Sequence, residues 1–310
     1  MNETIDSKPE MVRRRVAFIG LGSMGGALAD RAVAAGHDCV VHDKDTATME
    51  RFRDRALLVS SAREAAEQSD IVVACLAAAA HYDAVLTGPD GIVSAGKRLV
   101  YVHAGTSSVP MVRAWTEQLA AADIAMLDAP VTGGVGRAKA GDLTVMVAGP
   151  LQSYEFAEQV LRSYASKLVY FGEAAGAAQT MKLVNNMLNF ANLAAAAEIM
   201  VIGTKAGLDP EKMLDVINHG SGQNSATLAK FPNHILTGTF DYQGWISHVL
   251  KDGRAFLDEA ADMAVPAPLS AAVYQAFVHA FAVGDGRKDY DITEVIRYME
   301  QAAGVEVRRK

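Results

Sequence analysis

The chain has 310 residues, of which 50% are apolar and 21% charged, the composition of a globular protein with one large or two medium domains. Disordered and collagen-like chains are therefore excluded. The formal net charge of −7 disfavours binding to nucleic acid or to an anionic membrane surface. The two cysteines, Cys39 and Cys75, form no CxxC pair and cannot build a disulfide framework, so we expect a reducing, cytoplasmic location.

The first half of the chain alternates short apolar runs with helical patterns. Residues 1–15 have no apolar core of the kind a secretory signal needs, and we expect a flexible tail there. Residues 16–175 predict an α/β domain with a doubly wound, mostly parallel sheet covered by helices on both faces. The expected strands are 16–19, 39–42, 57–59, 71–75, 99–102, 124–127 and 143–147, and the clearest helices are 24–35 and 111–122. The short turn before the last strand favours an antiparallel course for it, and the longest uncharged apolar run, 71–80, is too short to cross a membrane.

Residues 176–310 lack this alternation and predict an all-α second domain. The expected helices are 177–206, 211–219, 250–263, 269–283 and 293–303. The first would be about 45 Å long at about 1.5 Å per residue, so we expect it to leave the first domain and form the spine of the second. Apolar helices of this kind often bury a face in a dimer, and a dimer is therefore expected.

A glycine-rich turn follows the first predicted strand and opens the first helix. Its residues are Gly20, Leu21, Gly22, Ser23, Met24 and Gly25. In this strand–turn–helix context G-x-G-x-x-G predicts dinucleotide binding: Gly20 permits the tight turn, Gly22 lets the backbone approach a pyrophosphate, and Gly25 allows close helix packing. The N–H groups at the helix start would then face the anion.

An acidic residue ends the second predicted strand. Asp43 stands where a carboxylate can accept the ribose 2′-hydroxyl of the adenosine, which favours NAD over NADP. The next residue, Lys44, could instead pair with a 2′-phosphate, and Asp43 could simply be a solvated turn residue. The cofactor is thus NAD or NADP, with NAD favoured.

A second glycine turn follows the strand at 124–127. It contains Thr132, Gly133 and Gly134 after Pro130, at the strand edge where open α/β sheets bind ligands. Its hydroxyl and N–H groups could hold a carboxylate. A glycine-rich surface turn explains the same residues equally well.

The long predicted helix carries Lys182 and Asn186, four residues apart and so on one face. A lysine beside a desolvated cleft can exchange protons near neutral pH, which suits a general acid or base. The alternative is a solvated surface lysine. Three histidines, His81, His103 and His248, are weaker acid–base candidates, of which His103 is the best placed.

Taken together, these motifs resemble the 3-hydroxyacid dehydrogenases, the group of 3-hydroxyisobutyrate dehydrogenase and tartronate semialdehyde reductase, which is related to 6-phosphogluconate dehydrogenases. Four blocks match in order between about Val16 and Val295, and they begin at Gly20, Asp128, Gly176 and Lys251. The resemblance implies a Rossmann-type domain, an all-α domain, and a homodimer or homotetramer. It also implies reversible hydride transfer between NAD(P) and a small 3-hydroxy acid, without a metal.

The resemblance also implies roles for the matching residues. Lys182 would be the catalytic acid–base, Asn186 would hold the substrate, and Lys251 would reach the cofactor and substrate. The turn of Thr132, Gly133 and Gly134 would bind the substrate carboxylate. The cofactor would also contact Leu76, Ala77, Thr106 and Ser107, and we expect residues 222–228 and Phe231 to line part of the substrate pocket.

The sequence departs from the family pattern near the cofactor and substrate rather than at the proton-transfer pair. Thr132 replaces the usual Ser, Ala77 replaces the usual Pro after Leu76, and Gly253 replaces Leu after Lys251 and Asp252. His103, Ala104 and Gly105 stand where an Asp usually precedes the Ser-Thr pair. An imine reductase shares this architecture but generally lacks the lysine. A non-catalytic dinucleotide-binding protein would not need Lys182, Asn186 and Lys251 together, and a methyltransferase would leave the later blocks unexplained.

Overall fold

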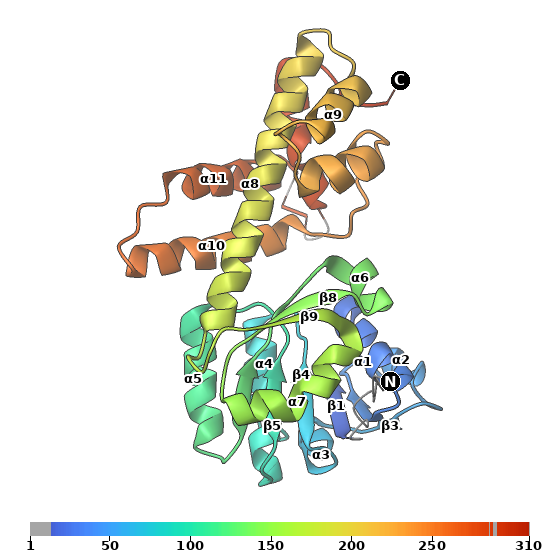
Figure 1. Ribbon diagram of the computed structural model, residues 1–310, viewed down its shortest axis with the longest axis vertical. Coiled ribbons are helices and arrows are strands. Elements are labelled where there is room, and N and C mark those ends of the chain that lie inside the picture. The colour runs from blue at the N-terminus through green and yellow to red at the C-terminus, as the bar shows by residue number, and fades with distance from the viewer. Residues whose placement is uncertain (1–13, 285, 288–289, 310) are drawn as a thin grey trace, which may run out of the picture. The chain divides into compact units, whose positions relative to one another are not determined.

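A computed structural model describes residues 14–284, 286–287 and 290–309, and it divides into two compact units, Met1–Lys182 and Leu183–Lys310 (Figure 1). The division falls within the helix α8 (Ala177–Lys205), whereas the sequence places the boundary just before this helix. Most of the expected N-terminal tail, residues 1–13, lies outside the described residues, and Arg15 already belongs to the first strand. Each unit is described by itself.

The first unit contains a parallel six-stranded sheet with the order β3-β2-β1-β4-β5-β6. Its strands are β1 (Arg15–Ile19), β2 (Asp38–His42), β3 (Leu57–Leu58), β4 (Ile71–Ala74), β5 (Val100–His103) and β6 (Ala125–Asp128). The order reverses between β1 and β4, whose register pairs Ala17 with Val72, while Ala17 pairs with Val40 of β2 on the other side. This topology is that of the dinucleotide-binding Rossmann fold, as predicted.

Both faces of the sheet are buried, because alternate residues of each strand enter two different cores. Val16 and Phe18 of β1 pack in one core, and Ala17 and Ile19 pack in the other. The helices of this unit are α1 (Ser23–Ala34), α2 (Thr46–Glu50), α3 (Ala62–Glu67), α4 (Ala79–Thr87), the 3-10 helix η1 (Ile92–Ala95), α5 (Val109–Ala120), α6 (Gly134–Ala140) and α7 (Leu151–Tyr164). The near-continuous apolar strands of the sequence thus reflect helices on both faces.

A second sheet corrects one prediction. The strand β8 (Leu143–Val147) pairs antiparallel with the short strand β7 (Val131–Thr132), as expected, but it does not join the main sheet. It pairs parallel with β9 (Ala165–Tyr170), which was not predicted because the exposed polar residues Ser166 and Lys167 interrupt its apolar run. Between β7 and β8 the chain forms the helix α6, which the sequence patterns do not predict.

The second unit is helical, as predicted. After α8 it contains α9 (Pro210–His219), the π-helix η2 (Ala226–Ile235), α10 (Ile246–Asp262), α11 (Pro268–Val283), the 3-10 helix η3 (Ile292–Ile296) and α12 (Arg297–Ala303). The helices α10 and α11 lie side by side (Figure 1). The sequence analysis missed η2 because Pro232 lies inside it; proline has no N–H to donate, and it normally ends an α-helix.

Among the described residues, one helix, α8, is long and apolar enough by length and composition to cross a membrane. The sequence analysis considered only the uncharged run 71–80. Within the helical unit, α8 contributes the fully buried side chains Leu193, Ala197 and Met200 to the core. The core helix of a globular unit passes the same test of length and composition, although Leu188, Ile199 and Ile202 of α8 are exposed.

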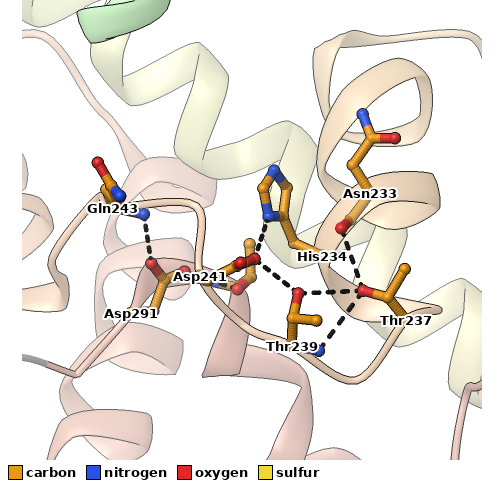
Figure 2. A network of polar contacts seen from close by, with 8 residues as sticks. Asn233, His234, Thr237, Thr239, Asp241, Gln243 and Asp291 are labelled. Atoms are coloured by element: carbon orange, nitrogen blue, oxygen red, sulfur yellow. Dashed lines mark hydrogen bonds and ion pairs between the residues drawn. The ribbon is translucent and has the colours of Figure 1, made fainter.

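The connection between η2 and α10 is held by side chains. His234 Nδ1 and Asp241 Oδ1 lie 2.6 Å apart, and the hydroxyl of Thr239 donates to the same carboxylate oxygen at 2.6 Å (Figure 2). The N–H of Gln243, a residue with a φ of 62°, donates to Asp291 Oδ2 at 2.8 Å. These contacts fix how the chain enters α10, the helix that carries Lys251.

Candidate active site

The glycine turn after β1 is packed tightly at two of its three glycines. Gly20 has a φ of 87°, and a Cβ there would lie 2.5 Å from the carbonyl oxygen of Cys75 at the end of β4. A Cβ on Gly25 would overlap the carbonyl oxygen of Gly20. These two positions therefore require glycine for the turn itself and for the approach of α1 to β1.

Gly22 differs from both, because a Cβ there would meet no atom of the described residues within 4 Å. It is the N-cap of α1, with a φ of −58°, and no described side chain caps the helix. The open space and the uncapped N–H groups of Ser23, Met24 and Gly25 lie at the start of a twelve-residue helix. This arrangement fits the pyrophosphate of a dinucleotide.

Asp43 follows β2 directly and contacts the same turn. Its Oδ2 accepts the N–H of Leu21 at 2.6 Å, and its Oδ1 accepts the N–H of Asp45 at 2.9 Å. Each oxygen has a second lone pair for a ribose hydroxyl. Lys44 is exposed, and Arg51, which the sequence analysis overlooked, places Nη2 3.5 Å from the carbonyl oxygen of Leu21.

The loops after β4 and β5 are tied together by Tyr82, another residue the sequence analysis missed. Its buried hydroxyl accepts the N–H of Leu76 at 2.8 Å, and a Cβ on Gly105 would overlap that hydroxyl. Gly105 is thus required for close approach of the two loops. Tyr82 holds the backbone beside Ala77, where the family pattern has a proline.

A buried glutamine joins the β5 loop to the end of β6. Gln179, in the first turn of α8, accepts the N–H of Ser107 with Oε1 at 3.1 Å and donates from Nε2 to the carbonyl oxygen of Gly105 at 3.0 Å. Nε2 also donates to Asp128 Oδ1 at 2.8 Å. Lys182, half-buried, lies three residues further along the same helix in the first unit, and Thr106 lies between the two held residues of the loop.

The second glycine turn combines strand and helix geometry. Thr132 ends β7 opposite Thr144, and the next two residues, Gly133 and Gly134, have φ values of 133° and 77°. A Cβ on Gly134 would meet nothing within 4 Å among the described residues. The turn therefore leaves open space at Gly134, and the carboxylate-binding role of these residues stays a prediction.

The helical unit brings the remaining predicted residues together. Asn186 Nδ2 donates to Asp252 Oδ2 at 2.8 Å, and the ammonium of Lys251 lies 3.2 Å from Asp252 Oδ1. The Asp252 carboxylate is buried, whereas Lys251 is 44% exposed. Asp252 thus fixes the amide of Asn186, a contact between residues 66 positions apart that no spacing in the sequence indicates.

The three histidines lie in unlike surroundings. His103 is completely buried, with its ring 4.5 Å from that of Tyr82 and 5.3 Å from that of Trp115. His81 is exposed, and burial, aided by nearby Lys251, lowers the pKa of His248. His103 was the best placed of the three acid–base candidates by sequence. Its burial among aromatic rings removes that advantage.

The expected lining of the substrate pocket is partly wrong. Phe231 is completely buried in the core of the helical unit, among residues such as Phe277 and Val295. Its place in η2, rather than in a loop, turns the ring inward. Leu228, from the segment 222–228, is 53% exposed.

Comparison with known proteins adds to this geometry. The family model described as the NAD binding domain of 6-phosphogluconate dehydrogenase matches residues 15–172, and that described as NAD-binding of NADP-dependent 3-hydroxyisobutyrate dehydrogenase matches residues 176–299. An L-threonate dehydrogenase of Cupriavidus necator is 35% identical over 89% of this chain and 93% of its own length. The chain belongs to the 3-hydroxyacid dehydrogenase family.

Other members of this 3-hydroxyacid dehydrogenase family are also similar over nearly the whole chain. A 2-(hydroxymethyl)glutarate dehydrogenase of Eubacterium barkeri is 33% identical over 94% of this chain and 97% of its own length. The structure of a Mycobacterium tuberculosis 3-hydroxyisobutyrate dehydrogenase with L-serine superposes with a TM-score of 0.83 at 26% identity, covering 93% of this chain and 99% of that one. The protein is therefore an oxidoreductase that uses a nicotinamide dinucleotide.

Imine reductases are more distant from this 3-hydroxyacid dehydrogenase. The enzyme from Myxococcus stipitatus with NAD+ has a TM-score of 0.64 at 19% identity, covering 93% of this chain and all of its own. At that identity the likeness concerns the fold alone.

Proposed function

We propose that this protein catalyses the reversible NAD(P)-dependent oxidation of a small 3-hydroxy acid, with Lys182 as the general acid–base. The observation that carries the proposal is the position of Lys182 on α8, three residues after Gln179, whose side chain bonds to the β5 loop and to Asp128 at the end of β6. The names of the family members L-threonate dehydrogenase and 3-hydroxyisobutyrate dehydrogenase support this substrate class.

The proposed roles follow from the chemistry of each side chain. Bound NAD(P)+ supplies the hydride acceptor, C4 of the nicotinamide ring. Lys182 removes the proton of the 3-hydroxyl during oxidation and returns it to the oxygen during reduction. The turn of Thr132, Gly133 and Gly134 holds the substrate carboxylate through its hydroxyl and N–H groups.

Two residues of the helical unit complete the proposal. Asn186 orients the reacting oxygen with its amide, which Asp252 holds in one direction. Lys251 adds a positive charge that favours an anionic substrate or cofactor.

For the cofactor, we propose NAD rather than NADP. The Asp43 carboxylate, already turned toward the glycine turn, suits two ribose hydroxyls and would repel a 2′-phosphate. Arg51 and Lys44 are the cations nearest in sequence and structure that could oppose this preference.

One assay tests both substrate class and cofactor. Short 3-hydroxy acids, among them L-threonate, 3-hydroxyisobutyrate, L-serine and glycerate, are offered with NAD+ and with NADP+, and cyclic imines are offered with the reduced cofactors. We expect turnover of at least one hydroxy acid, with a larger kcat/KM for NAD+. Reduction of imines without oxidation of any hydroxy acid would refute the proposal.

Gly22→Ala isolates the contribution of the open space at the turn. The variant should fold as the wild type does, because φ at Gly22 suits alanine and its Cβ meets nothing. We expect the added methyl group to displace the pyrophosphate and to raise the Kd for NADH by about 10-fold, equivalent to about 1.4 kcal/mol. Titration of NADH fluorescence measures the change. Gly136→Ala, at an exposed helical position of α6 where an added Cβ also meets nothing, serves as the control, and equal affinity of Gly22→Ala and wild type would contradict the assignment.

We further propose that the protein works as a homodimer through α11. This helix is rich in apolar residues, yet only Phe277 and Ala280 are buried, and Leu269 is 82% exposed. A second copy of the chain would cover this face. Sedimentation velocity should give a dimer for the wild type and a monomer for Leu269→Lys, and a monomeric wild type would exclude it.

A further inference from the structure

The buried side chain of Gln179 is bonded at every polar atom. It is 0% exposed, its Oε1 accepts from Ser107, and its Nε2 donates to Gly105 and Asp128. Its backbone N–H donates to the other oxygen of Asp128, Oδ2, at 2.9 Å. A completely satisfied buried glutamine has one orientation, because rotation in any direction would leave a donor or acceptor without a partner.

The same contacts join three separate parts of the first unit. Asp128 ends β6, Gly105 and Ser107 lie in the loop after β5, and Gln179 lies in the first turn of α8. Asp128 is itself 2% exposed, and both of its oxygens accept hydrogen bonds from Gln179. One side chain therefore sets the distance between the sheet edge, the β5 loop and the start of α8.

Two residues of the proposed site are placed by this arrangement. Lys182 is three positions after Gln179, so the two side chains are neighbours on the helix surface. Thr106 lies between the two loop residues that Gln179 bonds. An error of about 1 Å in such a placement can lower the rate of a reaction by about 100-fold.

We propose that Gln179, anchored by Asp128, is a positioning residue that sets Lys182 against the β5 loop. It touches neither substrate nor cofactor in this role. The inference rests on the proposed function, because the hydrogen bonds of Gln179 matter for catalysis only if Lys182 is the general acid–base.

Gln179→Met tests it, since methionine has a similar length but forms none of the three side-chain hydrogen bonds, while the backbone N–H of residue 179 can still donate to Asp128. We expect kcat about 100-fold below that of the wild type, with the Kd for NADH changed by less than about 3-fold. In the protein without ligands, amide hydrogen exchange at Ser107 should become faster, because its N–H loses its acceptor. Gln159→Met, at a half-buried glutamine of α7, is the matched control and should change neither quantity.

Gln179→Glu separates positioning from mere stability. The introduced carboxyl keeps the acceptor for Ser107, but it must be protonated to donate toward Gly105 or Asp128. Burial already raises the pKa of Asp128 to about 7, and a second carboxyl group against it should raise the pKa of the pair further, so that the two groups share a proton as the pH falls. We therefore expect kcat, relative to the wild type, to recover as the pH falls from 8 to 6, a change that a general loss of stability would not produce.

Failure of the proposed function and failure of the positioning role give different results. If the wild type turns over no 3-hydroxy acid, the proposed function fails, whatever the variants do. If the wild type is active and Gln179→Met has the same kcat and the same Ser107 exchange rate, the positioning role is wrong while the function stands. Should Gln179→Met not fold, Gln179→Glu decides alone, and a kcat ratio that is flat between pH 6 and 8 overturns the inference.

Discussion

Replacing Lys182 with methionine is expected to lower kcat for the oxidation of a 3-hydroxy acid by about 100- to 10,000-fold, the contribution of a general acid–base. Methionine keeps the length of the side chain and removes the proton acceptor. The Kd for NADH should stay within about 2-fold, because the glycine turn and α1 are formed by other residues. Steady-state kinetics and NADH fluorescence measure the two quantities, and Lys167→Met, at an exposed lysine of β9, is the control.

The variant Lys182→Ala provides a second test of the acid–base role. Lys182→Ala leaves space where the side chain stood, and a small primary amine in solution should restore part of the rate in proportion to the concentration of its neutral form. Full activity of Lys182→Met would exclude Lys182 as the acid–base. Loss of activity together with loss of NADH binding would mean that the lysine acts on the cofactor instead.

The strands and the glycine turn could be predicted because their causes are local. Strand β1 is buried on both faces, so its residues from Val16 to Ile19 are all apolar, and Gly20 must follow because its φ is positive and its neighbours are close. Helix α8 was predicted over its full length and one residue beyond its end, since its apolar spacing continues from Ala177 until Gly207 stops it. Where the residues of one segment determine its secondary structure, the pattern of apolar residues and glycines in the sequence is sufficient to predict it.

The contacts that hold the candidate site could not be predicted in this way. Gln179 bonds to Asp128, 51 positions away, and to Gly105, 74 positions away, and Asn186 bonds to Asp252 across 66 positions. The family motifs indicated the residue types but not these partners. Each pairing depends on how the strands and helices are ordered in space, which is decided by packing far from the residues concerned.

The π-helix η2 is the element that the sequence patterns most clearly failed to predict. It contains a lysine in unusual surroundings. Lys230 is 2% exposed, its ammonium donates to Asn189 Oδ1 at 2.9 Å, and it lies 4.9 Å from the centre of the Tyr242 ring. Burial lowers the pKa of Lys230 from 10.5 to about 8. The charged form is therefore less stable in the folded protein than in the unfolded chain.

Because of Lys230, the free energy of unfolding should depend on pH. Below pH 8 both the folded and the unfolded chain hold the Lys230 proton, and the folded protein carries the full penalty for burying the charge. Between pH 8 and 10.5 the folded protein releases the proton while the unfolded chain keeps it, so the free energy of unfolding rises with pH. The penalty at pH 7 is about 3 kcal/mol, at about 1.4 kcal/mol for each unit of pKa.

Lys230→Met should therefore stabilise the protein at pH 7, because it replaces a buried charge with an apolar side chain of similar size. We expect a gain of about 1–3 kcal/mol in the free energy of unfolding; the lower value applies if the bond to Asn189 and the contact with Tyr242 offset part of the penalty. Asn189 keeps the hydroxyl of Ser225 as a donor at 3.2 Å. Urea unfolding followed by circular dichroism measures the change.

The pH series distinguishes this cause from a general improvement in packing. The advantage of Lys230→Met over the wild type should shrink as the pH rises from 8 toward 10, because the wild type loses its buried charge over that interval. Lys212→Met, at an exposed lysine of α9, should show no such trend. A variant that is less stable than the wild type at pH 7 would show that Asn189 and Tyr242 stabilise the ammonium by more than its burial costs, and that this lysine supports the π-helix rather than straining it.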